Sequence, residues 1–97
     1  MIVKKYPINP NIEKTARLLA IAGDTTRIRI LCLMFEQKKA CVSEIAESID
    51  TSMQNASQHL RIMKDAGLFI TTREGNMICY ELITDDFTEK LKKIVYG

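Results

Sequence analysis

Residues 42–68, VSEIAESIDTSMQNASQHLRIMKDAGL, decide the fold of this 97-residue chain. Their apolar spacing predicts a short helix over residues 44–49 and a longer helix over residues 53–66. A polar turn, residues 50–52, separates the two. Two helices joined by a three-residue turn indicate a helix-turn-helix.

Capping residues support both helices of this stretch. Ser43 is a good N-cap for the first helix. For the second, Thr51 with Gln54 fits a capping box, and Ser52 is an equally good cap. The apolar seam expected to face the core in the second helix is Met53, Ala56, Leu60 and Met63.

Two further helices are expected before this stretch. Asn9 and Pro10 open a helix over residues 10–22, with Gly23 as its stop. Asp24 caps a second helix that runs to about Gln37. Apolar residues occur in nearly every turn of this second helix, so we expect the helix to form the buried centre of the domain.

After the stretch, the apolar period changes from helix to strand. Residues 68–73 and 77–83 are strand-like runs joined by a Glu-Gly-Asn turn, which predicts a β-hairpin. A short strand is also possible over residues 40–42. Thr84 is expected to cap a last helix, with Asp85 and Asp86 in its first turn. The predicted fold is mainly α with a small β-hairpin, a winged helix-turn-helix with five helices.

Length and composition fit one small folded domain over residues 1–97. Hydrophobic residues make up 46% of the chain, which is too apolar for disorder. The length excludes a multidomain enzyme, and a domain this small gains stability from dimerisation. The longest apolar run, residues 28–35, is too short to span a bilayer, and we see no signal peptide at the N-terminus. We therefore expect a cytoplasmic protein that does not act at a membrane.

The charge of the chain is uneven. Residues 1–39 carry eight basic and three acidic residues, whereas residues 40–97 carry six basic and nine acidic. Binders of nucleic acid usually show a stronger basic balance than the net +2 of this chain. Bulk charge alone therefore does not indicate a nucleic-acid partner.

Three motifs carry a resemblance to a known family. They are LAIAGDTTRIRILCLM, the quoted stretch from VSEIAES to DAGL, and REGNMICYEL. Together they make the chain resemble the ArsR/SmtB family of bacterial and archaeal repressors over residues 12–96. The middle motif is the specific one, with Ser52, Ser57, His59, Leu60, Ala66, Gly67 and Leu68 at the family's offsets. Thr25 departs from the family's usual Pro, and Asp50-Thr51 from its usual Gly and apolar residue.

The resemblance implies a transcriptional regulator that binds a palindromic operator as a homodimer. Dimerisation in the family uses the first and last helices. Both terminal helices here have broader apolar stripes than one face of a small core needs, although the stripes could instead cover the protomer's own core. The expected partners are double-stranded operator DNA and a second copy of the chain.

We expect the DNA-contacting residues on the outward face of residues 53–66 and on the hairpin. Gln and Asn can pair with adenine, Arg with guanine, and Ser with bases or phosphates. His59 lies at the edge of the seam, so it either reaches DNA or anchors the helix within the domain. The predicted set is Ser52, Gln54, Asn55, Ser57, Gln58, His59, Arg61, Lys64, Arg73 and Asn76.

The charge of the motif region keeps a second function open. Residues 43–83 carry three basic and six acidic residues, although phosphate attraction supplies most non-specific affinity for DNA. Most of these acids must therefore lie off the DNA face, and the salt dependence of binding should be low. The alternative is a winged-helix module for protein contacts, with weak or no specific DNA binding.

Three cysteines, Cys32, Cys41 and Cys79, are the candidate sensing thiols. An odd, sparse set argues against a disulfide framework. In the resembling family, one metal site uses a C-x-C motif, of which Cys41-Val42-Ser43 keeps one thiol. A soft-metal site needs two or three thiolates, and Cys41 could lie beside Cys79, so a site of this pair stays open. Release from DNA by thiol modification or by a soft metal is therefore an open alternative, whereas we assign no metal-ligating residues and expect no cofactor.

A thiol-sensing subgroup of the family offers a second possibility. RIRILCLM places Cys32 at that subgroup's sensing position, but Gly97 stands where its partner cysteine is expected. Cys32 alone could be oxidised or persulfidated, or it is simply a small core residue. No basic partner is arranged around any thiol and His59 is the one histidine, so an enzyme is not indicated.

Overall fold

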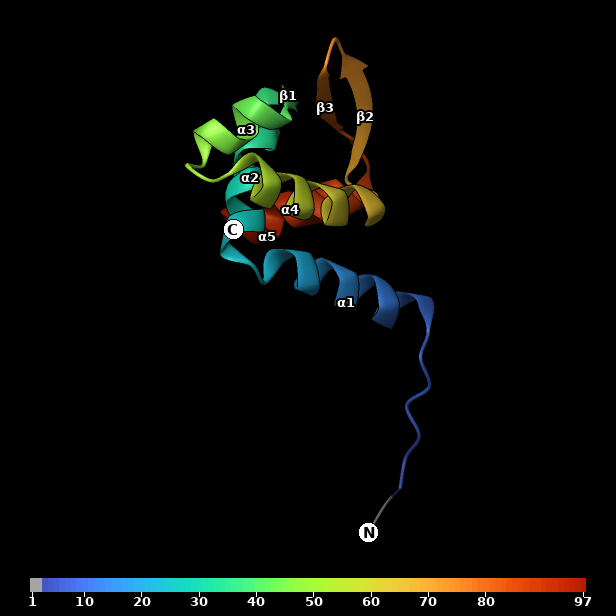
Figure 1. The fold of residues 1–97 in the computed structure, drawn as a ribbon. Helices are drawn as coiled ribbons and strands as arrows, with labels where there is room; N and C mark the ends of the chain where they lie inside the picture. Colours follow the sequence, from blue (N-terminus) through green and yellow to red (C-terminus); the bar gives the residue numbers. More distant parts are fainter. Residues whose placement is uncertain (1–2) are drawn as a thin grey trace.

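The computed structural model describes residues 3–97, so the first two residues of the predicted domain lie outside it. Five helices and three strands follow one another along the chain (Figure 1). They are α1 (Pro10–Ala22), α2 (Thr25–Gln37), β1 (Lys39–Cys41), α3 (Val42–Ser48), α4 (Met53–Asp65), β2 (Phe69–Glu74), β3 (Met77–Leu82) and α5 (Asp86–Tyr96). This order confirms the predicted fold class.

Three of the predicted N-caps are confirmed. The side chains of Asn9, Asp24 and Ser52 each accept a hydrogen bond of 3.0 Å from the backbone N–H three residues later. Each bond satisfies a donor that the first turn of a helix leaves free. For α4, the structure selects Ser52 over the Thr51 capping box.

The predicted caps of α3 and α5 are wrong by one or two residues. α3 begins at Val42 with Cys41 as its N-cap, and Glu44 accepts a 2.9 Å bond from the Cys41 N–H. α5 is capped by Asp85, not Thr84, because Asp85 and Thr88 exchange backbone-to-side-chain bonds of 3.0 Å. In both cases the residue at the third helical position selects the cap by bonding back to it.

The strands form one antiparallel sheet in the order β1-β3-β2. The hairpin of β2 and β3 is the predicted one, and Gly75 adopts a φ of +61° in its turn. β1 adds a third strand to β3, with Lys39 opposite Glu81 and Cys41 opposite Cys79. The long-range pairing therefore ties the start of α3 to the hairpin.

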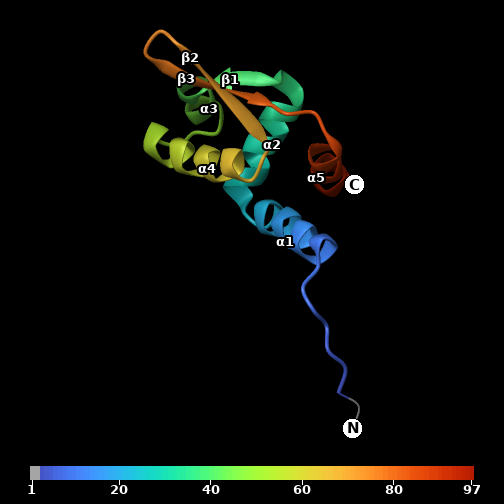
Figure 2. The ribbon, with the colours of Figure 1, turned by 90° about the vertical axis from the view of Figure 1, so that its right-hand side faces the viewer.

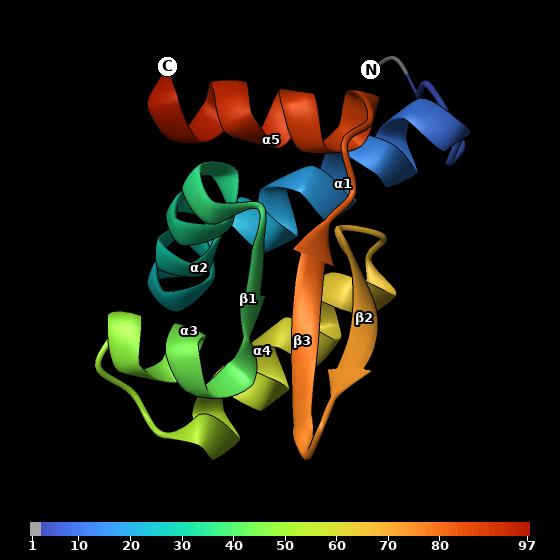
Figure 3. The ribbon, with the colours of Figure 1, turned by 90° about the horizontal axis from the view of Figure 1, so that it is seen from above.

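α2 forms the centre of the core, as predicted. Ile30, Leu31 and Met34 have no exposed surface. Seen along two axes, α1 and α5 lie together on one side of α2, and α3, α4 and the sheet lie on the other (Figures 2 and 3). The core thus joins a terminal-helix layer to a helix-turn-helix layer.

The terminal-helix layer leaves apolar side chains uncovered. On α1, Leu18 and Ile21 pack inward, whereas Ile12 and Leu19 are 47% and 61% exposed. On α5, Ile94 is 48% exposed. A shallow, largely apolar pocket runs along the outer face of α1, lined by Asn9, Asn11, Ile12, Thr15, Ala16 and Leu19. The core of one protomer therefore buries only part of the apolar stripes that were predicted for the first and last helices.

The backbone explains one departure from the family pattern. Asp50, which stands where Gly is usual, has a φ of +53°, a left-handed conformation. Asp tolerates this conformation better than most other residues with a side chain. The turn between α3 and α4 therefore keeps the shape that glycine would give it.

Within residues 3–97, every helix is too short or too polar to cross a membrane.

Candidate nucleic-acid interface

α4 separates a buried apolar seam from a polar outer face. Ala56, Leu60 and Met63 are completely buried against the core. Met53, predicted to belong to this seam, is 50% exposed, because it occupies the first helical position, ahead of the turn that contacts the core. The side chains that reach solvent from α4 include Gln54, Gln58, Arg61 and Lys64.

Three of the predicted DNA-contacting residues on α4 are only partly exposed, namely Asn55, Ser57 and His59. The Asn55 amide donates a 2.9 Å hydrogen bond to the Thr51 hydroxyl, which ties the helix to the preceding turn. Ser57 is half-buried on the side of the seam. Ser52 is exposed, and its hydroxyl accepts the capping bond from Asn55. The predicted DNA-contacting side chains that are exposed on this helix are therefore Gln54, Gln58, Arg61 and Lys64.

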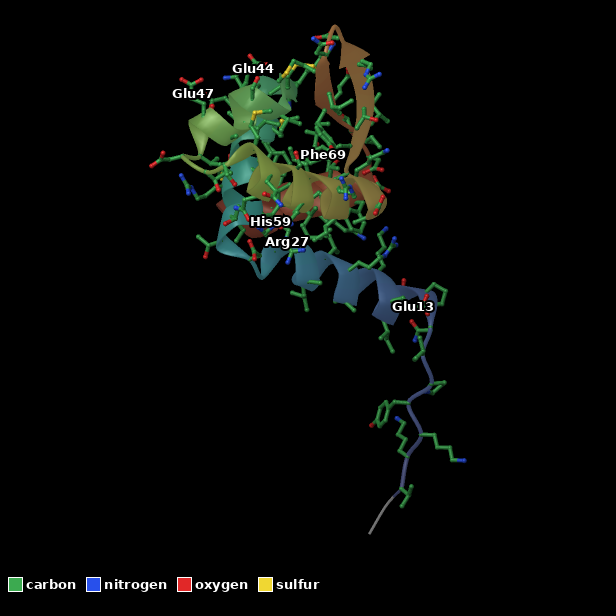
Figure 4. The ribbon with its side chains drawn as sticks, viewed as in Figure 1. Glu13, Arg27, Glu44, Glu47, His59 and Phe69 are labelled. Atoms are coloured by element: carbon green, nitrogen blue, oxygen red, sulfur yellow. A yellow bond between two sulfur atoms is a disulfide. The ribbon has the colours of Figure 1, made fainter. Side chains whose placement is uncertain are left out.

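His59 faces residues of α2 and the turn before it. Its Nδ1 atom is buried and has no hydrogen-bond partner among the described residues, and the same holds for Nε of Arg27 (Figure 4). Both side chains lie close enough to Asp24 to act on its charge. Of the two roles open for His59, this placement favours anchoring α4 to the start of α2.

The cap of α2 is the electrostatic centre of this contact. The pKa of Asp24 is lowered, first by the hydrogen bond from the Arg27 N–H and further by electrostatic interaction with the His59 and Arg27 side chains, while burial opposes the shift. The Arg27 guanidinium lies 3.9 Å from the carboxylate. Arg27 is not among the predicted site residues, although it lies in the first family motif.

The hairpin presents the other predicted contacts. Arg73, on β2, and Asn76, in the turn, are exposed at its tip. At its base, Phe69 and Tyr80 pack edge to face with ring centroids 5.9 Å apart. Burial raises the pKa of the Tyr80 hydroxyl above its ordinary value. The hairpin thus has a rigid base and a polar tip.

Three acidic residues of the motif region, Glu44, Glu47 and Glu74, lie outside α4, whereas Asp65 is exposed at its last position. Glu44 and Glu47 project from the outer side of α3, away from His59 on α4 (Figure 4). Glu74, at the end of β2, forms an ion pair with Lys39, Oε1 to Nζ 2.7 Å. A hydrogen bond and the charge of Glu74 raise the pKa of Lys39. Part of the negative charge is therefore neutralised or directed away from α4.

The three cysteines occupy two environments. Cys41 and Cys79 form a disulfide between β1 and β3. The expectation that the cysteines do not form disulfides is therefore wrong for this pair, because strand register brings together residues 38 positions apart. Glu74 lies beside both sulfurs, with Oε2 3.3 Å from Cys79 Sγ and 3.7 Å from Cys41 Sγ. When reduced, the three residues would offer two sulfurs and one oxygen to a soft cation.

Cys32 is a free, half-buried cysteine on α2. A hydrogen bond with Cys32 raises the pKa of Tyr96 at the end of α5, and burial adds to the shift. The thiol therefore lies close to Tyr96, at the C-terminal end of α5. The residues present form no second disulfide there.

Five helices with a helix-turn-helix, a polar face on its second helix and a β-hairpin beside it define a winged helix-turn-helix protein. Comparison with known proteins gives the family. The model of the arsR family of bacterial regulatory proteins matches residues 24–70. The chain belongs to this family, whose members are transcriptional regulators and not enzymes.

Relatives of known sequence or structure agree. An uncharacterised HTH-type transcriptional regulator of Methanocaldococcus jannaschii is 33% identical, over 84% of this chain and 92% of its own. A homologue of the cadmium resistance regulatory protein CadC of Staphylococcus aureus is 32% identical, over 95% and 73%. The homodimeric winged helix-turn-helix DNA-binding domain of a possible ArsR-family regulator of Mycobacterium bovis superposes with a TM-score of 0.74, at 25% identity, over 87% and 77%.

Proposed function

We propose that this protein is a repressor that binds a palindromic operator as a homodimer, with α4 in the major groove. The observation that carries the proposal is the outward face of α4, where Gln54, Gln58 and Arg61 are exposed above a completely buried seam. Glutamine can bond adenine with two hydrogen bonds, and arginine can bond guanine in the same way. A helix with a polar outer face and a buried apolar face can enter the groove without disturbing the core of the domain.

The remaining predicted residues fit positioning roles. Ser52 and Lys64 lie near the two ends of α4, where phosphates flank a helix in the groove. Arg73 and Asn76, at the hairpin tip, would lie at the adjacent minor groove or backbone. Asn55 and Ser57 are half-buried, so we assign them a smaller share of base contacts than Gln54 and Gln58.

The terminal helices supply the proposed dimer interface. Ile12 and Leu19 of α1 and Ile94 of α5 are about half exposed or more, and apolar patches of this kind mark association sites. The M. bovis relative is described as homodimeric. Two-fold symmetry would place two α4 helices on successive turns of the groove, which requires a palindromic site.

Release from DNA would follow modification of a thiol or binding of a soft metal. Cys32, Cys41 and Cys79 remain the candidate sensing residues. Cys32 has no cysteine partner, so its modification would be oxidation or persulfidation of a single thiol. A relative named for cadmium resistance supports a soft metal as the other class of inducer.

Fluorescence anisotropy on DNA from directly upstream of the protein's own gene tests the proposal. Scrambled DNA is present as competitor at about physiological salt, where non-specific binding is weak. We expect specific binding with a low salt dependence, because few basic residues flank α4. Equal binding to the scrambled sequence would contradict the proposal and favour a module for protein contacts.

A repeat with a persulfide donor and the Cys32→Ser variant tests the inducer. We expect the donor to release wild-type protein and to leave the variant bound. A variant that is released like the wild type would assign the response to another thiol.

A further inference from the structure

The Cys41–Cys79 disulfide lies at the junction between the helix-turn-helix and the hairpin. Cys41 is both the last residue of β1 and the N-cap of α3, the first helix of the motif. Cys79 lies opposite it in the middle of β3. Besides this bond, β1 is held to the hairpin by three register positions, a 2.8 Å hydrogen bond from the Leu82 N–H to the Lys38 carbonyl, and the Lys39–Glu74 ion pair. The bond is therefore the strongest link between the hairpin and α3.

The pair is accessible from one side only. Cys79 is completely buried, whereas Cys41 is partly exposed. Glu74 lies next to both sulfurs and is itself exposed, at the hairpin tip. A reagent from solvent therefore reaches the sulfur of Cys41 first.

We propose that Cys41 and Cys79 are a reversible thiol–disulfide pair that takes dithiol reductants and locks the hairpin to the helix-turn-helix when oxidised. The proposal rests on the proposed DNA binding for its consequence, but not for its chemistry. It assigns the response to dithiols to a pair separate from Cys32, which lies on α2 against the end of α5. The response to persulfides proposed above stays with Cys32.

The reaction is thiol–disulfide exchange. A thiolate of the dithiol reductant attacks Cys41 Sγ, the sulfur–sulfur bond breaks, and Cys79 leaves as a thiolate that takes up a proton. The second thiol of the reductant then attacks its own sulfur in the mixed disulfide and releases Cys41. Two electrons and two protons pass to the protein, and the reductant becomes a disulfide. A disulfide oxidant of the same class reverses the steps.

Reduction should loosen the hairpin without unfolding the core. The side chains that fill the core come mainly from α2, α3, α4 and α5, and neither sulfur links those helices. Arg73 and Asn76 would then lose some of their fixed position relative to α4. Ordering them again on DNA costs conformational entropy, so the reduced protein should bind operator more weakly, by about three- to tenfold.

The test equilibrates the full chain in mixtures of reduced and oxidised dithiothreitol with a chelator present. Thiols are counted by alkylation under denaturing conditions and mass spectrometry. We expect one reactive thiol in the oxidised protein, three in the reduced protein, and a single two-electron transition between them. Hydrogen exchange should become faster in β2 and β3 on reduction, and much less so in α2.

Variants separate this pair from the remaining cysteine. Cys32→Ser should keep the transition, the change in hydrogen exchange and the change in DNA affinity. Cys41→Ser should lose all three, and it leaves the buried Cys79 in place, which favours a folded variant. Three reactive thiols in wild type under oxidising conditions, or equal hydrogen exchange in both states, would overturn the proposal.

DNA binding is measured in the same samples. Weaker binding of the reduced form supports the full proposal, and equal affinity of both forms overturns the effect on binding. If neither form binds specifically, the proposed function fails, whereas thiol counts and hydrogen exchange still decide whether the pair locks the hairpin.

Discussion

α1 and α4 are both helices of 13 residues with an apolar stripe, yet they use that stripe differently. α4 buries Leu60 completely and presents glutamine and arginine to solvent. α1 buries Leu18 but leaves Leu19 61% exposed. The outer face of α4 is suited to a polar partner and that of α1 to an apolar one. In a domain this small, the outward face of an amphipathic helix thus indicates what the helix binds.

The largest expected effect comes from the buried side of α4. Leu60→Ala removes a completely buried side chain, so we expect a loss of about 2–5 kcal/mol in the free energy of unfolding. Urea unfolding followed by circular dichroism measures it. Leu19→Ala on α1 is the matched control, and it should change the stability of the isolated protomer little. Equal losses in the two variants would remove the contrast between the helices.

Leu19→Glu should act on association instead of folding. A charge on the apolar face of α1 would weaken the dimer by about 2 kcal/mol, or about thirtyfold in its dissociation constant. Analytical ultracentrifugation measures the change, and Ser48→Glu, on the exposed surface of α3 and outside the terminal helices, controls for charge alone. A wild-type protein that is monomeric at all concentrations would refute the interface on α1.

Gln58→Ala with Asn55→Ala should weaken specific DNA binding while leaving the dimer intact. We expect about 1–2 kcal/mol of lost discrimination, since a good two-bond contact to a base contributes about this much. Gln58 should account for most of the loss, because the Asn55 amide is engaged with Thr51. Competition between specific and scrambled DNA measures the effect, and an unchanged sequence preference would refute base contacts from this face.

The smallest expected effect concerns the N-caps of the helices, which differ in charge. α1 and α4 begin with neutral caps, Asn9 and Ser52, whereas α2 begins with Asp24. Because folding lowers the pKa of Asp24, its contribution is complete above the ordinary value of 3.8 and is lost as pH falls through the folded value. Asp24→Ala should cost about 1 kcal/mol near neutral pH and less in acid.

Asp24→Asn is the control for charge, because asparagine is also a good cap. Its free energy of unfolding should fall less than that of wild type between about pH 5 and pH 3. Urea unfolding across this range measures the difference, and parallel curves for the two proteins would mean that the charge of Asp24 contributes nothing.

Local signals explain what the sequence could predict. The caps at Asn9, Asp24 and Ser52, the hairpin turn and the period of each helix involve residues within a few positions of one another. The polar outer face of α4 follows from the same period. These features gave the fold class and most of the proposed interface, and the family motifs added the expected dimer.

Long-range contacts explain the structural features that the sequence did not predict. The disulfide depends on the register of β1 against β3, which no local pattern in residues 39–41 specifies. The exposure of Met53 depends on where the core ends beneath α4. The contact of His59 with Asp24 and Arg27 joins two helices that are far apart in sequence. Each of these three features depends on the packing of distant segments and could be found only from the structure.

The strand order β1-β3-β2 also has a consequence for the synthesis of the protein. β1 emerges from the ribosome well before its partner β3, and α1 emerges before α5, on which it packs. A nascent chain that ends after α4 therefore has an unpaired strand edge at the start of its helix-turn-helix. Contacts between distant segments delay folding until both are available. The protein can reach its final structure only when the last helix has been made.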